Sequence, residues 1–331
     1  MRIALIGLQR EHTPPAGYGA VGRIVAGLAV ALSRHAEVLT VVAEGSRVSP
    51  RSFEVPYVGR RGTPEPEQME RYADVISGCD VVHNHDPETI EWLEKHVAAP
   101  IVTTLHTNRL PTGSPTARFA YLSEFQARYL KRVGFCGWTR PIVVPPTPDR
   151  DAPRSEDLLV LGQIRPEKGI VDACRLAAET GRRLILAGPL AHRNKMWFAE
   201  VKSQFGERLV HVGEVADPDR LRLLRTSAAL LFLSCPAEPL GLVMLEAMSV
   251  GTPVLALDRG ACSELVTDGI SGFVRRDVES LAMTVDDLAY LRPDLVRKSV
   301  ERFSEDIVVE EHLRLYRRVA QGSPLAMEST S

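Results

Sequence analysis

The sequence predicts an α/β protein built from two doubly wound domains. Three features support this: short runs that are apolar at every position, longer segments of helical periodicity between them, and a proline-rich connector near the middle of the 331-residue chain. Parallel strands need continuously apolar runs when helices cover both faces of their sheet. Two series of such runs alternating with helices therefore indicate two domains, as the chain length also favours.

The apolar runs are expected to be the strands of the two sheets. In the first half they are residues 2–7, 38–43, 80–84, 101–106, 119–123 and 142–145. The second half repeats the rhythm at residues 158–162, 184–188, 209–213, 229–234, 253–258 and 272–275. Runs of this length, separated by helix-length segments, are typical of βαβ units.

The connector and the last helix set the predicted boundaries. Residues 145–153 contain four prolines, typical of a stiff, extended linker, so we predict domains at 1–145 and 146–305. Residues 306–321 have the spacing of an amphipathic helix and are expected to pack back on the first domain. The small, polar residues 322–331 are expected to be a frayed tail.

Composition argues against several classes of protein. The chain has 40 basic and 42 acidic residues, a net charge of -2, which argues against nucleic-acid binding through general phosphate attraction. The five cysteines contain no CxxC pair, so neither a disulfide framework nor a zinc site is expected. The first apolar run is too short for a signal peptide or a membrane span. We therefore expect a cytoplasmic protein with at most peripheral membrane contact.

A glycine-rich segment near the start resembles a dinucleotide fingerprint. Residues Gly17 to Gly22 satisfy G-x-G-x-x-G, but the first strand ends at Gly7, and Pro14 and Pro15 intervene. A dinucleotide site needs the first glycine in the turn that leaves the strand. A loop that presents backbone N–H groups at a helix start is the favoured interpretation. A glycine-rich turn without a ligand and an NAD site stay open as alternatives.

The second half carries two charged segments at predicted strand ends. Arg165 and Lys168 follow the run 158–162 just before a helix. Two cations at the carboxyl edge of a parallel sheet suit an anionic group such as a diphosphate. A solvated turn is the structural alternative.

The segment after the run 229–234 is more specific. Gly241 and Leu242 fall at a predicted helix start, where free N–H groups favour an anion. Glu238 precedes that helix, and Glu246 lies within it among apolar residues. A carboxylate in such surroundings is costly unless it is hydrogen-bonded, and vicinal ribose hydroxyls are one possible partner. A solvent-facing glutamate is the alternative for Glu246.

These segments resemble glycosyltransferase family 4, the retaining nucleotide-sugar enzymes of GT-B fold. Glu238 and Glu246 match its E-x7-E motif, and residues 162–169 are similar to its glycine- and lysine-containing phosphate segment. Further matches are Gly251-Thr252-Pro253-Val254, Glu264, Asp268-Gly269, Gly272, His83, His85, His106 and Ser123. The chain departs from many relatives in lacking a second adjacent glycine at Gly19 and in carrying Leu240 for a frequent Phe.

The resemblance implies two Rossmann-like domains facing across a cleft and retaining transfer of a sugar from a nucleoside diphosphate to an acceptor. UDP or GDP is expected as the donor nucleotide in preference to ADP. The first domain has no basic amphipathic segment, so we expect a soluble small molecule as the acceptor. We expect no cofactor and no metal, since two cations and a helix dipole can do the work of a magnesium ion. The implied catalytic residues are His106, Arg165, Lys168 and Glu238. The implied donor-binding residues are Gly17, Gly19, Arg165, Lys168, Gly213, Glu238, Gly241, Leu242 and Glu246, and the implied acceptor-side residues are Tyr18, His83 and His85.

Three other functions fit parts of the sequence. A nucleotide-sugar 2-epimerase of GT-B fold would convert its donor without an acceptor. A non-catalytic sugar-nucleotide sensor would bind without turnover, although the charged residues Arg165, Lys168, Glu238 and Glu246 are all present. An NAD-dependent oxidoreductase would use the segment that begins at Gly17.

Overall fold

The computed structural model describes residues 1–48, 52–55, 66–112, 117–143, 153–235 and 237–322. The chain folds into two units. The first unit holds Met1–Pro15, Gly19–Ile142 and Glu305–Ser331, and the second holds Ala16–Tyr18 and Val143–Ser304. The predicted connector falls largely outside the described residues.

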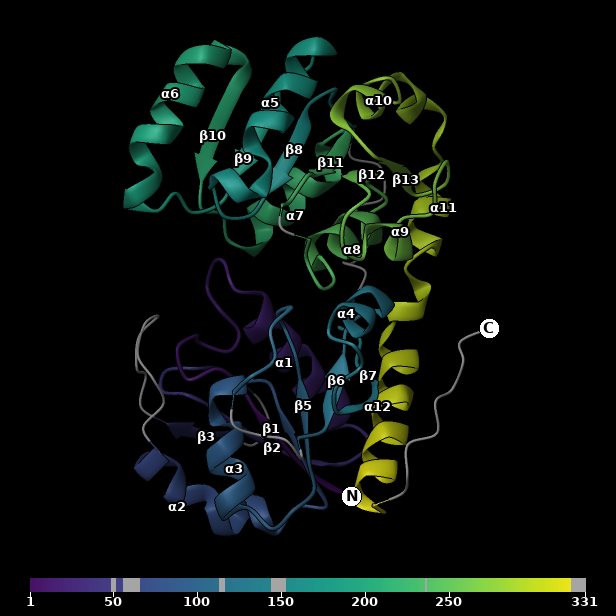
Figure 1. The fold of residues 1–331 in the computed structure, drawn as a ribbon. Coiled ribbons are helices and arrows are strands. Elements are labelled where there is room, and N and C mark those ends of the chain that lie inside the picture. The colour runs from purple at the N-terminus through teal and green to yellow at the C-terminus, as the bar shows by residue number, and fades with distance from the viewer. Residues whose placement is uncertain (49–51, 56–65, 113–116, 144–152, 236, 323–331) are drawn as a thin grey trace. The chain divides into compact units, whose positions relative to one another are not determined.

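A parallel sheet of seven strands, in the order β3-β2-β1-β4-β5-β6-β7, forms the centre of the first unit (Figure 1). Its strands are β1 (Arg2–Ile6), β2 (Glu37–Ala43), β3 (Ser52–Val55), β4 (Val81–Asn84), β5 (Ile101–Thr104), β6 (Phe119–Tyr121) and β7 (Phe135–Trp138). Its helices are α1 (Ala20–Leu32), α2 (Pro66–Ser77), α3 (Ile90–His96), α4 (Glu124–Tyr129) and α12 (Glu305–Ala320).

Both faces of this sheet are covered. Ile3 and Leu5 of β1 pack in one core with residues of α1 and α12, whereas Ala4 and Ile6 pack in a second core with residues of α2 and α3. Side chains alternate across a strand, so a run buried on both sides must be apolar throughout. This is the physical reason why the continuous apolar runs predicted the sheet correctly.

The last helix belongs to the first unit, as predicted. Val309, Leu315 and Val319 of α12 join the core that contains Ile3. Figure 1 shows α12 running beside β7 at the edge of the sheet. The C-terminal helix thus returns to the first unit after the chain has completed the second.

Six parallel strands in the order β10-β9-β8-β11-β12-β13 form the sheet of the second unit. They are β8 (Leu158–Leu161), β9 (Leu184–Ala187), β10 (Leu209–Gly213), β11 (Ala229–Phe232), β12 (Val254–Leu257) and β13 (Gly272–Arg275). The helices are α5 (Ile170–Glu179), α6 (Lys195–Phe205), α7 (Asp217–Thr226), α8 (Leu242–Ser249), α9 (Cys262–Leu265), α10 (Val278–Ala282) and α11 (Pro293–Lys298).

One strand prediction in the first half is wrong. Ile142 and Val143 lie outside any strand, and the rest of the run 142–145 lies outside the described residues. Pro141 cannot donate a hydrogen bond to a sheet ladder, and the N–H of Val143 donates instead to the carbonyl of Phe303 at 2.8 Å. The outer strands β3 and β7 were not predicted. The fold class itself is confirmed.

Candidate functional site

The order of the second sheet reverses between β8 and β11, which lie side by side with Leu158 opposite Ala229. At such a reversal the loops that follow the two strands leave in opposite directions and open a crevice at the carboxyl edge. Open α/β sheets bind ligands there. The loop after β8 carries Arg165 and Lys168, and the loop after β11 carries Glu238.

The structure brings Lys168 and Glu238 together at this point. The Lys168 Nζ atom forms an ion pair with Glu238 Oε1, and both side chains are largely buried. The Ser234 hydroxyl donates a hydrogen bond to the same oxygen at 2.8 Å. The N–H of Cys235 donates to the carbonyl of Glu167 at 2.7 Å, which ties the two loops together. A cation and a carboxylate seventy positions apart therefore share one crevice.

Gly169 allows the β8 loop to sit against β11. Its φ is +68°, and a Cβ atom there would lie 2.4 Å from the carbonyl oxygen of Leu233. Gly260 has a comparable role, because its Cβ atom would lie 2.5 Å from the carbonyl oxygen of Glu238. Both glycines let backbone segments approach the site more closely than any side chain permits.

Gly169→Ala is expected to destabilise the protein by at least about 2 kcal/mol, because the alanine would add a left-handed backbone penalty to a collision with Leu233. Urea unfolding measures the change. Gly181→Ala is the control, since Gly181 also has a φ of +68° at the end of α5, but only the flexible end of the Arg208 side chain lies within 4 Å of the position that a Cβ atom would take. Equal losses in the two variants would show that the close approach at Leu233 is unimportant.

Arg165 is placed differently from Lys168. Its Nε atom lies 3.9 Å from Glu167 Oε2, and its side chain is 37% exposed. It thus forms its ion pair with Glu167 and not with Glu238 or Glu246. Arg165 remains at the carboxyl end of β8, immediately before the short 3-10 helix Pro166–Lys168.

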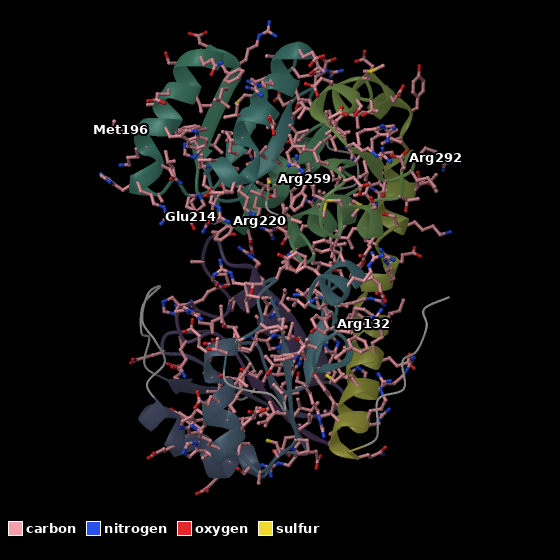
Figure 2. The ribbon with its side chains drawn as sticks, viewed as in Figure 1. Arg132, Met196, Glu214, Arg220, Arg259 and Arg292 are labelled. Carbon is pink, nitrogen blue, oxygen red and sulfur yellow. The ribbon has the colours of Figure 1, made fainter. Side chains whose placement is uncertain are left out.

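Glu246 has a partner that the sequence did not indicate. Its Oε2 atom lies 2.6 Å from Arg220 Nη1, and the two side chains are only 18% and 14% exposed. Arg220 belongs to α7. Figure 2 shows it at the end of the second unit where the carboxyl end of strand β10 lies. A buried carboxylate in an apolar helix thus gains a cation from a neighbouring helix.

The predicted donor-binding glycines lie at turns of the same edge. Gly241 is the N-cap of α8, with a φ of +93°, and Leu242 is the first residue of that helix. A Cβ atom at Gly241 would lie 2.6 Å from Met244 Cε and 2.9 Å from Phe232 Cζ. Gly213 ends β10 with a φ of +80° and open space where a side chain would be.

Two carboxylates contact the glycine-rich loop before α1. Glu11 Oε1 accepts a hydrogen bond from the N–H of Gly22 in the first turn of α1 at 2.8 Å. Glu214 Oε1 accepts from the N–H of Tyr18 at 2.7 Å, and residues Ala16–Tyr18 group with the second unit. Gly17 leaves room for Glu214, and Gly19 is the N-cap of α1. The sequence had indicated neither glutamate.

The three predicted histidines lie in a buried cluster in the first unit. His83, at the end of β4, contacts Tyr316 through Nδ1 at 2.7 Å and Thr104 through Nε2 at 2.6 Å. His85 Nδ1 lies 3.0 Å from His106 Nε2. The ring centroids of His83 and His85 are 4.1 Å apart. The predicted residues are therefore brought together, and Tyr316 is a partner supplied by the last helix.

Burial keeps these imidazoles neutral. Burial lowers the pKa of His106 to about 4 and holds the pKa values of His83 and His85 well below the ordinary value of 6.5. His312 of α12 lies beside the cluster, with its ring centroid 5.9 Å from that of His83, and burial lowers its pKa to about 4. Neutral imidazoles can exchange hydrogen bonds with a ligand but bring no positive charge.

A buried carboxyl group and an arginine lie at the strand-order reversal of the first sheet, which falls between β1 and β4. Asp86 is fully buried, and its Oδ1 atom lies 3.3 Å from Arg10 Nη2 and accepts the N–H of Glu88 at 3.1 Å. Desolvation outweighs the Arg10 charge and raises the pKa of the Asp86 carboxyl. The sequence patterns did not indicate Arg10 or Asp86 as site residues.

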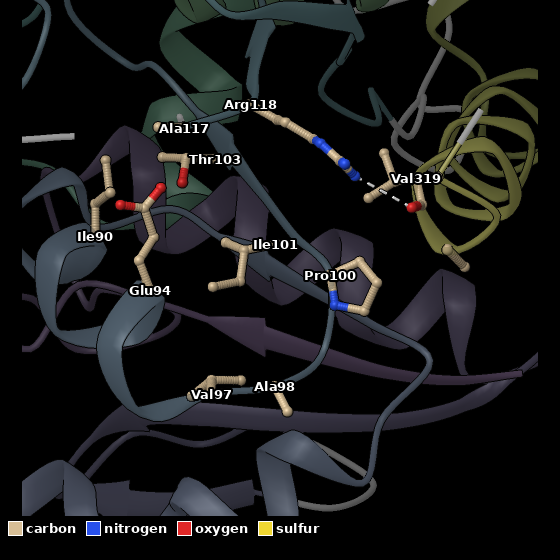
Figure 3. A pocket seen from close by; sticks show the side chains of 12 residues that line it. Ile90, Glu94, Val97, Ala98, Pro100, Ile101, Thr103, Ala117, Arg118 and Val319 are labelled. Atoms are coloured by element: carbon tan, nitrogen blue, oxygen red, sulfur yellow. Dashed lines mark hydrogen bonds between the residues drawn. The ribbon is translucent and has the colours of Figure 1, made fainter. Parts of the chain in front are cut away.

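A cavity of ≈ 330 Å³ in the first unit lies apart from these residues (Figure 3). It is bordered by Glu94 of α3, by Ile101 where β5 begins, and by Arg118, which donates to the carbonyl of Val319 at 3.2 Å. None of the predicted site residues lines it. It lies where β5 and β6 begin, not at the carboxyl edge.

Comparison with known proteins finds a family match in the second unit. Residues 150–305 match the family model described as glycosyl transferases group 1. The matched segment contains Arg165, Lys168, Glu238 and Glu246, the charged residues on which the predicted donor site depends.

Whole-chain similarities extend the comparison to the first unit. AviGT4, a glycosyltransferase involved in avilamycin A biosynthesis, is 27% identical with a TM-score of 0.79, over 97% of this chain and 98% of that one. HepE of Anabaena, solved in complex with UDP and glucose, is 14% identical with a TM-score of 0.70, over 97% and 99%. These similarities show that the chain has the GT-B fold.

A sequence relative covers most of the chain as well. The phosphatidyl-myo-inositol mannosyltransferase of Mycobacterium leprae is 24% identical over 325 residues, which span 84% of this chain and 85% of that protein. Among the described residues, no helix combines the length and apolarity needed to cross a bilayer. Within the same described ranges, no three His, Cys, Asp or Glu side chains are grouped to hold a metal ion.

Proposed function

We propose that this protein is a retaining glycosyltransferase that moves a sugar from a nucleoside-diphosphate sugar to an acceptor hydroxyl. The observation that carries the proposal is the half-buried ion pair between Lys168 and Glu238 at the strand-order reversal of the segment that matches the group 1 glycosyltransferase model. That position suits a nucleotide ligand. The UDP complex of HepE supports UDP as the donor nucleotide. GDP is the second candidate that we propose.

In this proposal the diphosphate is held by positive charge and backbone N–H groups. Lys168 and Arg165 supply the cations, and the N–H groups at Gly241 and Leu242 lie at the start of α8, where the helix dipole favours an anion. As the diphosphate leaves, negative charge grows on its terminal phosphate. Fixed donors aimed at developing charge are the main electrostatic means of lowering such a barrier. They can serve in place of a metal ion.

The carboxylates have separate proposed roles. Glu246 accepts hydrogen bonds from the ribose hydroxyls, and Glu238 accepts them from hydroxyls of the donor sugar. A carboxylate offers about four acceptor positions, so contacts with Ser234 and Lys168 are compatible with sugar hydroxyls. His106 is proposed to serve the donor sugar, and Tyr18, His83 and His85 the acceptor, which we propose is a soluble small molecule or glycoside.

Retention follows in this proposal from reaction on one face of the sugar. The bond between the anomeric carbon and the phosphate oxygen breaks while the acceptor oxygen bonds to the same face. The sugar is oxocarbenium-like between these events. The acceptor proton passes to the departing phosphate oxygen, which makes a separate protein base unnecessary. The neutral state of His106 agrees with a hydrogen-bonding role there.

Proton NMR of donor turnover tests this function. Incubation with UDP-glucose or GDP-mannose, with water or a small polyol as acceptor, is expected to release the nucleoside diphosphate and a sugar that first appears as the α-anomer. A β-anomer as the first product would contradict retention. Conversion of either donor to its 2-epimer, without net release of the diphosphate, would replace transfer by epimerisation.

A further inference from the structure

Arg220 connects the proposed ribose carboxylate to a neighbouring helix. Arg220 Nη1 lies 2.6 Å from Glu246 Oε2, and the same guanidinium donates through Nε to Asp217 at 3.1 Å. Its side chain is 14% exposed. The guanidinium is thus hydrogen-bonded to Asp217 of its own helix α7 and forms an ion pair, without an aligned hydrogen bond, with Glu246 of α8.

We infer that Arg220 is a positioning residue for Glu246 and thereby sets the preference of this site for ribose over 2′-deoxyribose. The inference rests on the proposed function of Glu246. A carboxylate among apolar side chains is costly unless its charge is compensated. The ion pair with Arg220 compensates this charge and restricts the positions from which the carboxylate can meet hydroxyl groups.

A second ion pair on α7 shows by comparison how little the contact between Arg220 and Glu246 is exposed to solvent. Arg222 lies 3.3 Å from Asp219 with the same three-residue spacing that separates Arg220 from Asp217. The Arg222 and Asp219 side chains are 66% and 63% exposed, so water screens that pair. Water screens the ion pair of Arg220 and Glu246 far less. A substitution of Arg220 is therefore expected to change the electrostatic surroundings of the Glu246 carboxylate.

The planar guanidinium matters as well as its charge. It can hold Asp217 and Glu246 through different nitrogens in fixed directions, whereas a lysine ammonium is a single point of charge on a flexible stem. Arg220→Lys would therefore keep a positive charge beside Glu246 but leave the position of its carboxylate less well fixed. This difference separates positioning from simple charge balance.

Calorimetric titration with UDP, GDP and their 2′-deoxy derivatives tests the inference. We expect the wild-type protein to bind the ribonucleotide roughly tenfold more tightly than the deoxy form, the size expected for a hydrogen bond to a charged acceptor. Arg220→Gln should reduce this ratio to about threefold or less, with Arg220→Lys in between. Arg222→Gln is the matched control and should keep the full ratio.

Glu246→Gln and the double variant Arg220→Gln/Glu246→Gln complete the cycle. If Arg220 acts through Glu246, the double variant has the same low ratio as Glu246→Gln alone. A general structural role of Arg220 would instead weaken both nucleotides equally and leave the ratio tenfold, which would overturn the inference while the proposed function stands. If Arg220→Gln does not fold, an unchanged ratio in Arg220→Lys would overturn it. Absence of binding by the wild-type protein to every nucleotide would overturn both.

Discussion

Replacing Lys168 by methionine is expected to lower the turnover number for sugar transfer about 100- to 1,000-fold, the usual cost of losing one transition-state charge stabiliser. Methionine keeps a long apolar side chain but removes the ammonium group that contacts Glu238. The negative charge that grows on the departing diphosphate would then lack its most buried cation. Steady-state release of nucleoside diphosphate from UDP-glucose or GDP-mannose measures the effect.

Folding and catalysis must be separated in this variant. Ser234 still donates to Glu238 when Lys168 is lost, so the carboxylate keeps a partner and the loop keeps its anchor. Circular dichroism should accordingly show a folded protein. Lys202→Met is the control, because Lys202 is an exposed lysine on α6 of the same unit. Turnover of Lys168→Met within about threefold of wild type would remove this residue from the proposed mechanism.

The free energy of unfolding is expected to fall steeply as the pH drops from about 6.5 to 4. Burial lowers the pKa of His106 and of His312 to about 4, whereas an unfolded histidine titrates near its ordinary value of 6.5. Between these values the unfolded chain binds more protons than the folded one, so stability rises with pH in this window. The contribution of these buried histidines to the free energy of unfolding is complete above pH 6.5 and is lost as the pH falls toward 4.

The expected size is about 2 kcal/mol per histidine at pH 5 for His106 and His312, and His83 and His85 act in the same direction. Urea unfolding at pH 7.5 and pH 5 measures the difference. His312→Gln should reduce the dependence of stability on pH, whereas His35→Gln, at an exposed position, should leave it unchanged. Identical pH dependence in wild type and His312→Gln would show that burial does not suppress protonation of His312.

The fold could be predicted because the inner strands beside the site, such as β4, β8 and β11, are buried on both faces. The outer strands β3 and β7 were not predicted, because they lack a continuous apolar run. Strand β7 is four residues long and contains Gly137, and β3 reads Ser-Phe-Glu-Val, so neither forms a continuous apolar run. A strand at the edge of a sheet needs fewer apolar positions, and its signal in the sequence is correspondingly weak.

The site could be predicted only as far as loops and strand ends define it. Lys168 and Glu238 follow strands that are adjacent at a strand-order reversal, so their meeting is a consequence of topology. The contact of Arg220 with Glu246 depends on how α7 packs beside α8, which periodicity does not reveal. The same holds for Tyr316, which reaches His83 from a helix 233 positions later.

Thermal unfolding with ligands tests whether the second unit binds a nucleoside diphosphate through Lys168 and its neighbours. UDP, GDP, ADP, dTDP and NAD are each added at millimolar concentration in the presence of EDTA, to wild type and to Lys168→Met. We expect UDP or GDP to stabilise the wild type, by about 2.7 kcal/mol at a hundred times its dissociation constant, and the variant much less. Stabilisation by NAD alone, or equal stabilisation of both proteins, would contradict it.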